Sequence, residues 1–167
     1  MNEQRRLGAA QLAQRRFESE RIEKSELGDA GVVSDHSPCT PELKHLGDGD
    51  VERAWGGIAS LQFGLPIIWT SGRLTLERIV RLMCEGPAAI AGIRKGTIQP
   101  GYDADLVIWS PEEWFRVTPE IVQHRHKITP YAGEQLRGVV RATYLRGQKV
   151  WQDGRAIGSP SGKWIRK

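Results

Sequence analysis

A carboxylate, an imidazole and a hydroxyl stand side by side at Asp35, His36 and Ser37, and Pro38 follows them directly. A short apolar run precedes them, so we predict a buried strand over residues 31–34 that the proline ends. In a parallel α/β enzyme, polar residues at the carboxyl end of a strand face the active site. Asp35 is therefore the candidate catalytic residue.

Three other sets of residues have the side-chain types found in metal sites, but their positions in the sequence favour other interpretations. His124-Arg125-His126 would place two rings on one side of a strand, yet it lies far downstream of the candidate aspartate. His36 and Cys39 have a spacing seen in zinc sites, but no second pair follows them, and we interpret it as chance. Asp103 and Asp105 fit a turn that enters a strand.

The elements that must position these residues change character along the chain. Apolar residues recur at helical spacing before residue 92 and alternate with polar residues after it. We predict helices over residues 51–65, 74–84 and 87–91, a buried strand over 105–109, and further strands over 139–145 and 149–152. Arg146-Gly147-Gln148 is typical of a hairpin turn between the last two strands. Gly56-Gly57 weakens the first helix, or marks a place where the backbone approaches another group closely.

Size and composition restrict the class of protein. The chain has 167 residues, of which 39% are hydrophobic, and it suits one ordinary domain without a membrane-spanning run. Two cysteines give no disulfide framework, which favours a reducing compartment. Residues 1–30 lack the apolar core of a secretory signal, and their five glutamates argue against an organellar transit peptide without excluding it. We predict a cytoplasmic or mitochondrial protein that is not secreted.

The net charge of +4 is unevenly distributed. Residues 125–167 carry ten basic and two acidic side chains. A basic segment can bind nucleic acid or an anionic lipid surface, but these residues are spread singly through predicted strands, and no nucleic-acid motif accompanies them. We therefore favour a solvated sheet face, predict neither a nucleic-acid nor a membrane partner, and keep nucleic-acid binding as a weaker alternative.

Several segments together resemble a known family. They are Ser34-Asp35-His36-Ser37-Pro38, Ala54-Trp55-Gly56-Gly57-Ile58, Leu61-Gln62, Lys95-Gly96-Thr97-Ile98 and Gly101-Tyr102-Asp103-Ala104-Asp105-Leu106-Val107. Over residues 32–167 the chain resembles the C-terminal part of the allantoinases, which are cyclic amidohydrolases like dihydroorotase and the hydantoinases. The last segment indicates only the wider amidohydrolase superfamily, whereas the first two narrow the resemblance to the allantoinases.

The resemblance implies an α/β fold and a specific activity. Family members have a (β/α)₈ barrel with two metal ions, usually zinc, at its mouth, and a small β-sandwich. They hydrolyse the hydantoin ring of allantoin to allantoate in purine catabolism, and they are often homo-oligomeric. We thus expect a polar helical or disordered head over residues 1–30, the last barrel strand and its helices over 31–92, and a sandwich part with a terminal hairpin over 93–167.

The resemblance also assigns roles to individual residues. Asp35 matches the family's aspartate, which binds one metal ion and shuttles the proton during hydrolysis. Ser37 and Trp55-Gly56-Gly57 match positions that bind the cyclic amide, and the two glycines let backbone groups pair with it. The alternative is that Trp55 anchors the core at a helix entry. His36 is expected to orient Asp35.

The same comparison shows what the chain lacks. The family uses five metal ligands besides the aspartate, and none of them has a match here; residues 1–30 contain no histidine. A catalytic zinc typically takes about three protein ligands, and a closed barrel needs roughly 200 residues or more. We therefore expect a truncated fragment that does not retain zinc and is inactive alone. The alternative is a non-catalytic interaction or assembly protein derived from an amidohydrolase.

Overall fold

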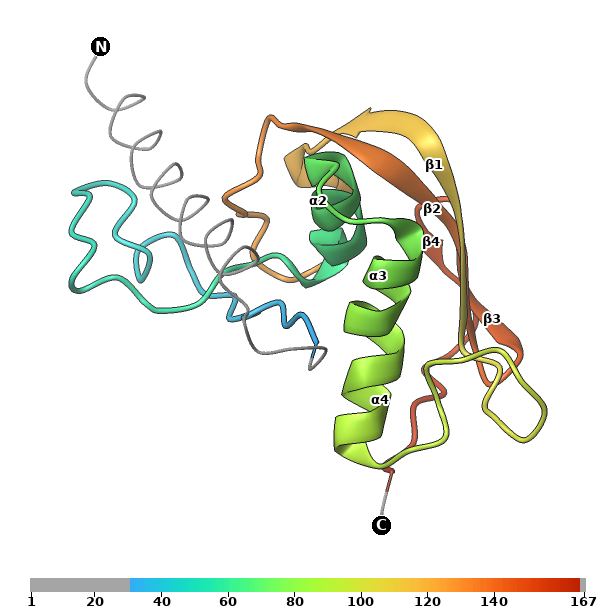
Figure 1. The fold of residues 1–167 in the computed structure, drawn as a ribbon. Coiled ribbons are helices and arrows are strands. Elements are labelled where there is room, and N and C mark those ends of the chain that lie inside the picture. The colour runs from blue at the N-terminus through green and yellow to red at the C-terminus, as the bar shows by residue number, and fades with distance from the viewer. Residues whose placement is uncertain (1–30, 166–167) are drawn as a thin grey trace.

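The computed structural model describes residues 31–165, so the head predicted over residues 1–30 lies outside the described residues. The elements are η1 (Leu61–Phe63), α2 (Gly64–Ser71), α3 (Leu76–Val80), η2 (Arg81–Glu85), α4 (Gly86–Ala91), β1 (Leu106–Arg116), η3 (Pro119–Ile121), β2 (Gln135–Leu145), β3 (Gln148–Gln152) and β4 (Arg155–Ala156). Helices lie beside one curved sheet, and the loop that precedes them projects away from it (Figure 1). No helix in residues 31–165 is long and apolar enough to cross a membrane.

The sheet has the order β1-β2-β3-β4, and all its pairings are antiparallel. Arg146 and Gly147 both have positive φ angles (49° and 78°), the conformation of a tight hairpin turn between β2 and β3, which confirms the predicted hairpin. The strand predicted over residues 105–109 forms as part of β1. Its predicted burial is wrong, because β1 is an edge strand and leaves Val107 and Ile108 half exposed.

The helices α3 and α4 are joined by the π turn η2 into one continuous column (Figure 1). The helices predicted over residues 74–84 and 87–91 are thus confirmed, but no gap separates them. Within the π turn the Leu82 carbonyl would need a donor at position 87, and proline has no N–H. The N–H of Val32 donates to this carbonyl instead, at 2.9 Å. Gly92 then ends the column in the left-handed conformation.

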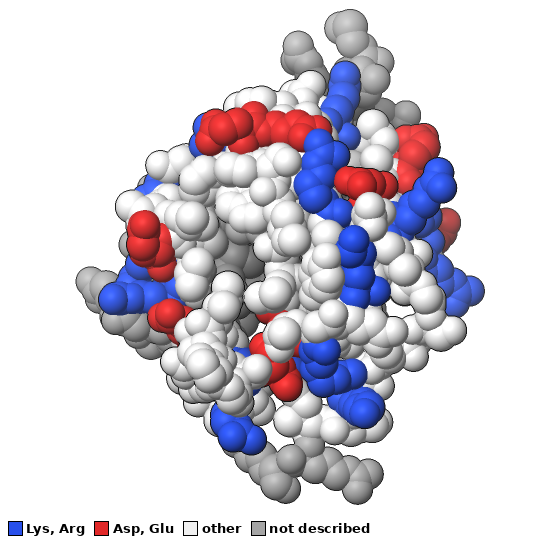
Figure 2. Space-filling view, turned by 90° about the vertical axis from the view of Figure 1, so that its right-hand side faces the viewer, with Lys and Arg blue, Asp and Glu red and all other residues white. Residues whose placement is uncertain are grey.

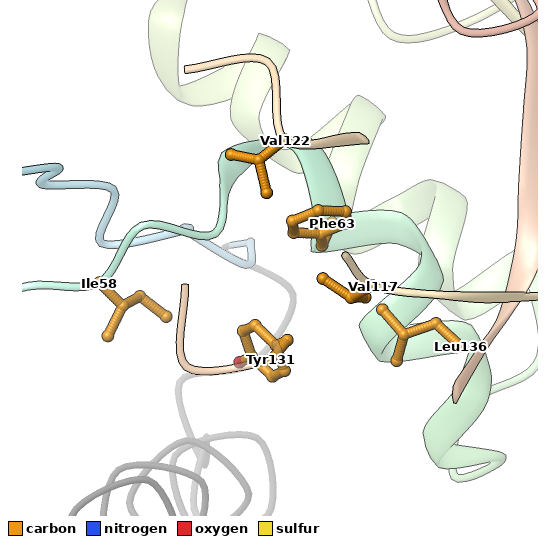
Figure 3. Close-up of a cluster of buried hydrophobic side chains, with 6 residues drawn as sticks. All are labelled: Ile58, Phe63, Val117, Val122, Tyr131 and Leu136. Carbon is orange, nitrogen blue, oxygen red and sulfur yellow. The ribbon is translucent and has the colours of Figure 1, made fainter. Parts of the chain in front are cut away.

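The hydrophobic core joins segments that are far apart in the sequence. Its buried residues are Ile58, Phe63, Val117, Val122, Tyr131 and Leu136 (Figure 3). Phe63 is 1% exposed and its ring stacks on Phe115 of β1, with the ring centroids 6.5 Å apart. This cluster fixes the end of the projecting loop against the start of β2.

Two predicted elements are wrong. The helix predicted over residues 51–65 does not form, because these residues make turns up to η1 and the helix α2 begins only at Gly64. The buried strand predicted over residues 31–34 is also absent. Val33 is 82% exposed, and the nearest strand-like pairing in residues 31–165 is a single parallel bridge between His36 and Ile58.

Candidate functional site

Asp35 occupies a special backbone position at the surface. Its φ angle is +48°, in the left-handed region that aspartate tolerates better than most residues, and its side chain is exposed. The Asp35 carbonyl accepts the Ile58 N–H at 2.8 Å, and the Ser37 N–H donates to the Ile58 carbonyl at 2.9 Å. These two bonds hold the Asp35 segment beside the chain that follows the Gly56-Gly57 turn.

Ser37, Trp55 and Gly57 lie together next to Asp35. The indole N–H of Trp55 donates to the Ser37 hydroxyl at 2.8 Å. A Cβ on Gly57 would lie 2.6 Å from the Ser37 Cβ and 2.8 Å from the Asp35 carbonyl oxygen, so only glycine fits there. Trp55 is 53% exposed, so the alternative of a buried core anchor is wrong. The substrate-binding roles of these residues stay predictions.

Lys44 contacts this turn and was not identified from the sequence. Its ammonium donates to the carbonyl oxygens of Trp55 (2.7 Å), Gly57 (2.5 Å) and, more distantly, Gly56 (3.5 Å). The Trp55 N–H donates to the Leu43 carbonyl at 2.8 Å. The N–H groups of Ile58, Ser60 and Leu61 donate to the Asp35 carbonyl and to His36 rather than to carbonyls four residues earlier, so the backbone of this segment pairs with other segments and not as a helix.

His36 caps the turn that leads into η1. Its Nδ1 accepts the backbone N–H groups of Ser60 and Leu61, both at 3.2 Å, and its ring meets the edge of His124 with the centroids 5.5 Å apart. Burial, and then the charge of His124, lower the pKa of His36, which favours the neutral ring that can accept these bonds. The contacts seen for His36 thus run to this turn, and orientation of Asp35 stays a prediction.

The described residues do not fit a metal centre. Within residues 31–165, no cluster of three or more His, Cys, Asp or Glu side chains could hold a metal ion. The His124 Nε2 lies 3.0 Å from the Ile128 carbonyl oxygen, and Asp103 and Asp105 both pair with Lys95. A catalytic zinc requires about three protein ligands, so Asp35 could supply one ligand of such a site but not the site.

Basic side chains have acidic neighbours on the surface. Figure 2 shows the two kinds of charge intermixed on one face. In the basic C-terminal segment, Arg141 pairs with Glu113 and with Asp153, and Arg137 lies 3.5 Å from Glu112. Such pairing is expected if the basic segment forms a solvated face of the sheet. The absence of a nucleic-acid partner stays a prediction.

Comparison with known proteins gives the family. Residues 34–151 match the description "Amidohydrolase family". The chain belongs to this family. It is 46% identical over 127 residues to an allantoinase of Streptomyces avermitilis, covering 74% of this chain and 28% of that protein. It is 44% identical over 128 residues to an allantoinase of Saccharomyces cerevisiae, covering 75% of this chain and 28% of that protein. The chain therefore spans little more than a quarter of these relatives.

Solved structures give the same relationship in three dimensions. The L-hydantoinase of Arthrobacter aurescens matches 77% of this chain and 30% of its own, with a TM-score of 0.72 and 36% identity. A D-hydantoinase of a Thermus species matches 78% of this chain and 30% of its own, with a TM-score of 0.70 and 26% identity. The antiparallel sheet and the helices beside it thus have the fold of part of a hydantoinase.

Proposed function

We propose that this chain contributes to a cyclic amidohydrolase that opens the hydantoin ring of allantoin to give allantoate, a step of purine catabolism. One observation carries the proposal. Asp35, Ser37 and the Trp55–Gly57 turn gather at one place in a chain that is 46% identical over 127 residues to an allantoinase. The described residues lack a metal site, and we expect them to be inactive without further parts of a barrel.

The exposed groups at this place suit the hydrolysis of a cyclic amide. The Asp35 carboxylate is accessible, and a carboxylate can take a proton from the attacking water and return it to the leaving ring nitrogen. Gly56 has open space around its Cα, so a flat ring could approach its backbone closely. Zinc, which the resemblance implies, would need ligands besides Asp35 from outside the described residues.

We further propose that the Asp35 segment, which forms a single bridge and not a regular strand in this structure, occupies the position of the last strand of a (β/α)₈ barrel that residues 31–92 leave incomplete, and that residues 93–167 belong to a β-sandwich. The parallel bridge between His36 and Ile58 is compatible with a barrel strand. Val33 and Leu61 are 82% and 64% exposed, and neighbouring barrel strands would remove such apolar side chains from water.

A chimera tests this function. Residues 34–151 would replace the matching segment of the Streptomyces avermitilis allantoinase, and ring opening of allantoin would be measured. We expect turnover, and a loss of about 100-fold or more in kcat for Asp35→Asn, as for removal of a proton-transfer group. Asp103→Asn is the matched control, because its amide oxygen can still accept from Lys95, and we expect near-normal turnover. A folded chimera without turnover would contradict the proposal, as would an active Asp35→Asn.

A second function, as a non-catalytic assembly partner, is favoured by the exposed apolar side chains. The uncovered residues include Val33 in the loop that precedes the helices, Leu61 at the start of η1, and Ile108 on the edge strand β1. The partner that would cover them is another amidohydrolase chain, either a second copy or a barrel that lacks this part. Size-exclusion chromatography of the purified chain tests it, since a stable 18.7 kDa monomer that binds no such barrel would argue against assembly.

A further inference from the structure

We propose that Lys44 is a positioning residue, an internal cation whose ammonium fixes the backbone of the Trp55–Gly57 turn beside Asp35. The role of the turn in holding a cyclic amide rests on the proposed function above. The geometry that Lys44 imposes on the turn does not depend on that function.

The contacts of Lys44 match the chemistry of an ammonium group. It has three N–H donors, and three successive carbonyl oxygens, those of Trp55, Gly56 and Gly57, face it at 2.7, 3.5 and 2.5 Å. The residue before it takes part as well, because the Leu43 carbonyl accepts the Trp55 N–H. The turn is therefore bound at both its first amide and its carbonyls by one short stretch of chain.

This arrangement decides where the amides of the turn point. The described peptide bonds are all trans, and a trans peptide directs its N–H opposite to its carbonyl. The Gly57 carbonyl faces Lys44, and the N–H of the same peptide, that of Ile58, donates to the Asp35 carbonyl. By the same rule, the N–H groups of Gly56 and Gly57 point away from the ammonium, where a ring carbonyl could meet them.

The hydrogen bonds from Lys44 to the turn are few but strong. Hydrogen bonds from a charged donor are about twice as strong as neutral ones. Lys44 is half-buried, and its contacts in residues 31–165 are with carbonyls rather than carboxylates. Loss of the ammonium should therefore release the turn and the segment bonded to it, while the sheet stays intact.

Amide hydrogen exchange of the full 167-residue chain tests the proposal in the absence of any substrate. In Lys44→Ala we expect the amides of Trp55 and Ile58 to exchange about tenfold faster or more, which corresponds to the loss of a charge-assisted hydrogen bond. The amides of β2 should keep their rates. Lys149→Ala is the matched control, because it removes a surface lysine from β3, and it should change the rates of Trp55 and Ile58 by less than about twofold.

Two rescue measurements separate positioning from a general loss of structure. Lys44→Arg should restore most of the protection, because a guanidinium also offers several donors to carbonyl oxygens. Ammonium chloride should slow exchange in Lys44→Ala, whereas tetramethylammonium chloride at equal ionic strength should not, because it has no N–H donor. Wild-type rates at Trp55 and Ile58 in Lys44→Ala would overturn the proposal, as would the failure of both rescues.

The consequence for ligand binding has a separate readout. In an active chimera, Lys44→Ala should raise the KM for allantoin about tenfold and change kcat by less than about threefold, the pattern expected when binding is lost equally from the ground state and the transition state. If the chimera is inactive, the proposed function fails while the exchange results still decide the role of Lys44. If exchange changes as expected but KM does not, the turn is positioned by Lys44 but does not bind the ring.

Discussion

The sheet and the loop that carries Asp35 are held together in different ways. In the sheet, β1 and β2 pair along most of their length, and Trp69 of α2 packs edge-on against Trp109, with the ring centroids 5.2 Å apart. In the loop, residues 31–60, burial is concentrated at Cys39, Ile58 and Ala59, and the other links include one parallel bridge, the hydrogen bonds of Lys44 and the bond from Trp55 to Ser37. The sheet is stabilised by long strand pairing and burial, and much of the loop by polar contacts.

Apolar side chains are exposed in both regions. Val33, Val51 and Trp55 in the loop are 82%, 69% and 53% exposed and Val107 and Ile108 of β1 are about half exposed, whereas Ile58 in the loop and Leu136 in β2 are buried. The groups proposed to do chemistry lie among exposed apolar side chains of the loop, which the other elements of the proposed barrel would cover.

The largest expected effect is on the core beneath both regions. Phe63→Ala removes a ring that is 1% exposed and stacked on Phe115, and we expect the free energy of unfolding to fall by about 3–5 kcal/mol. Urea unfolding followed by circular dichroism measures it. Leu61→Ala, two residues away and 64% exposed, is the control and should cost less than about 1 kcal/mol. Equal losses would mean that the core does not depend on Phe63.

A smaller effect is expected inside the loop. Gly57→Ala would place a Cβ 2.6 Å from that of Ser37, and a left-handed alanine alone costs roughly 1–2 kcal/mol. We expect faster amide exchange at Ile58 and unchanged exchange in β2. Gly56→Ala, with nothing within 4 Å of its added Cβ, is the matched control and should leave both rates near wild type. If Gly57→Ala also made the β2 amides exchange faster, the two regions would not be independent.

The sequence predicts the sheet part better than the loop, for a physical reason. The β2-β3 hairpin follows from a turn at Arg146-Gly147 between neighbouring segments, and the column α3–α4 from local apolar spacing and a left-handed Gly92. The predicted helix over residues 51–65 has acceptable spacing, but the backbone of this segment pairs with Asp35, His36 and Lys44 instead. That competition comes from residues outside the segment, and a periodic pattern cannot reveal it.

The site was predicted in the same uneven way. Asp35, Ser37, Trp55 and Gly57 were identified because their residue types and order resemble a family, and the structure places them side by side. Lys44 was missed because its partners are backbone carbonyls, which every residue possesses, so no residue type marks them. Lys44 lies 11 residues before Trp55 in the sequence, and no spacing pattern connects the two positions.

The next effect depends on pH and lies in the sheet part. Burial disfavours the charged form of Asp105, but hydrogen bonds from Lys95 and from the Arg146 N–H outweigh it and lower the pKa of this carboxyl. A lowered pKa stabilises the fold above the unfolded value of about 3.9, and this stabilisation is lost as the pH falls through the folded value. Asp105→Asn should therefore reduce the loss of stability as the pH falls below about 4.

At neutral pH the same substitution removes a charged acceptor, and we expect a loss of about 1–3 kcal/mol in the free energy of unfolding. Asp103→Asn is the control, because Asp103 shares Lys95 but lacks the bond to Arg146. Hydrogen bonds from Lys95 to Asp103 and Asp105 also raise the pKa of the lysine. The charged lysine therefore stabilises the fold below about pH 10, and this stabilisation is lost as the pH rises through the raised pKa. An acid profile for Asp105→Asn that matches wild type would contradict this assignment.

The smallest expected effects on the free energy of unfolding distinguish the aromatic contacts of Arg137 from its ion pair with Glu112. The Arg137 guanidinium lies 5.2 Å from the Trp69 ring centroid and 5.9 Å from that of Trp114, whereas the Glu112 carboxylate is 3.5 Å away and 79% exposed. Glu112→Gln should change the free energy of unfolding by less than about 0.5 kcal/mol, because exposed ion pairs contribute little. Arg137→Met should cost about 1 kcal/mol through lost cation–π contact. If the two losses were equal, or if 0.5 M salt abolished the effect of Arg137→Met, ionic rather than aromatic contacts would hold this arginine, and the sheet would share the polar character of the loop.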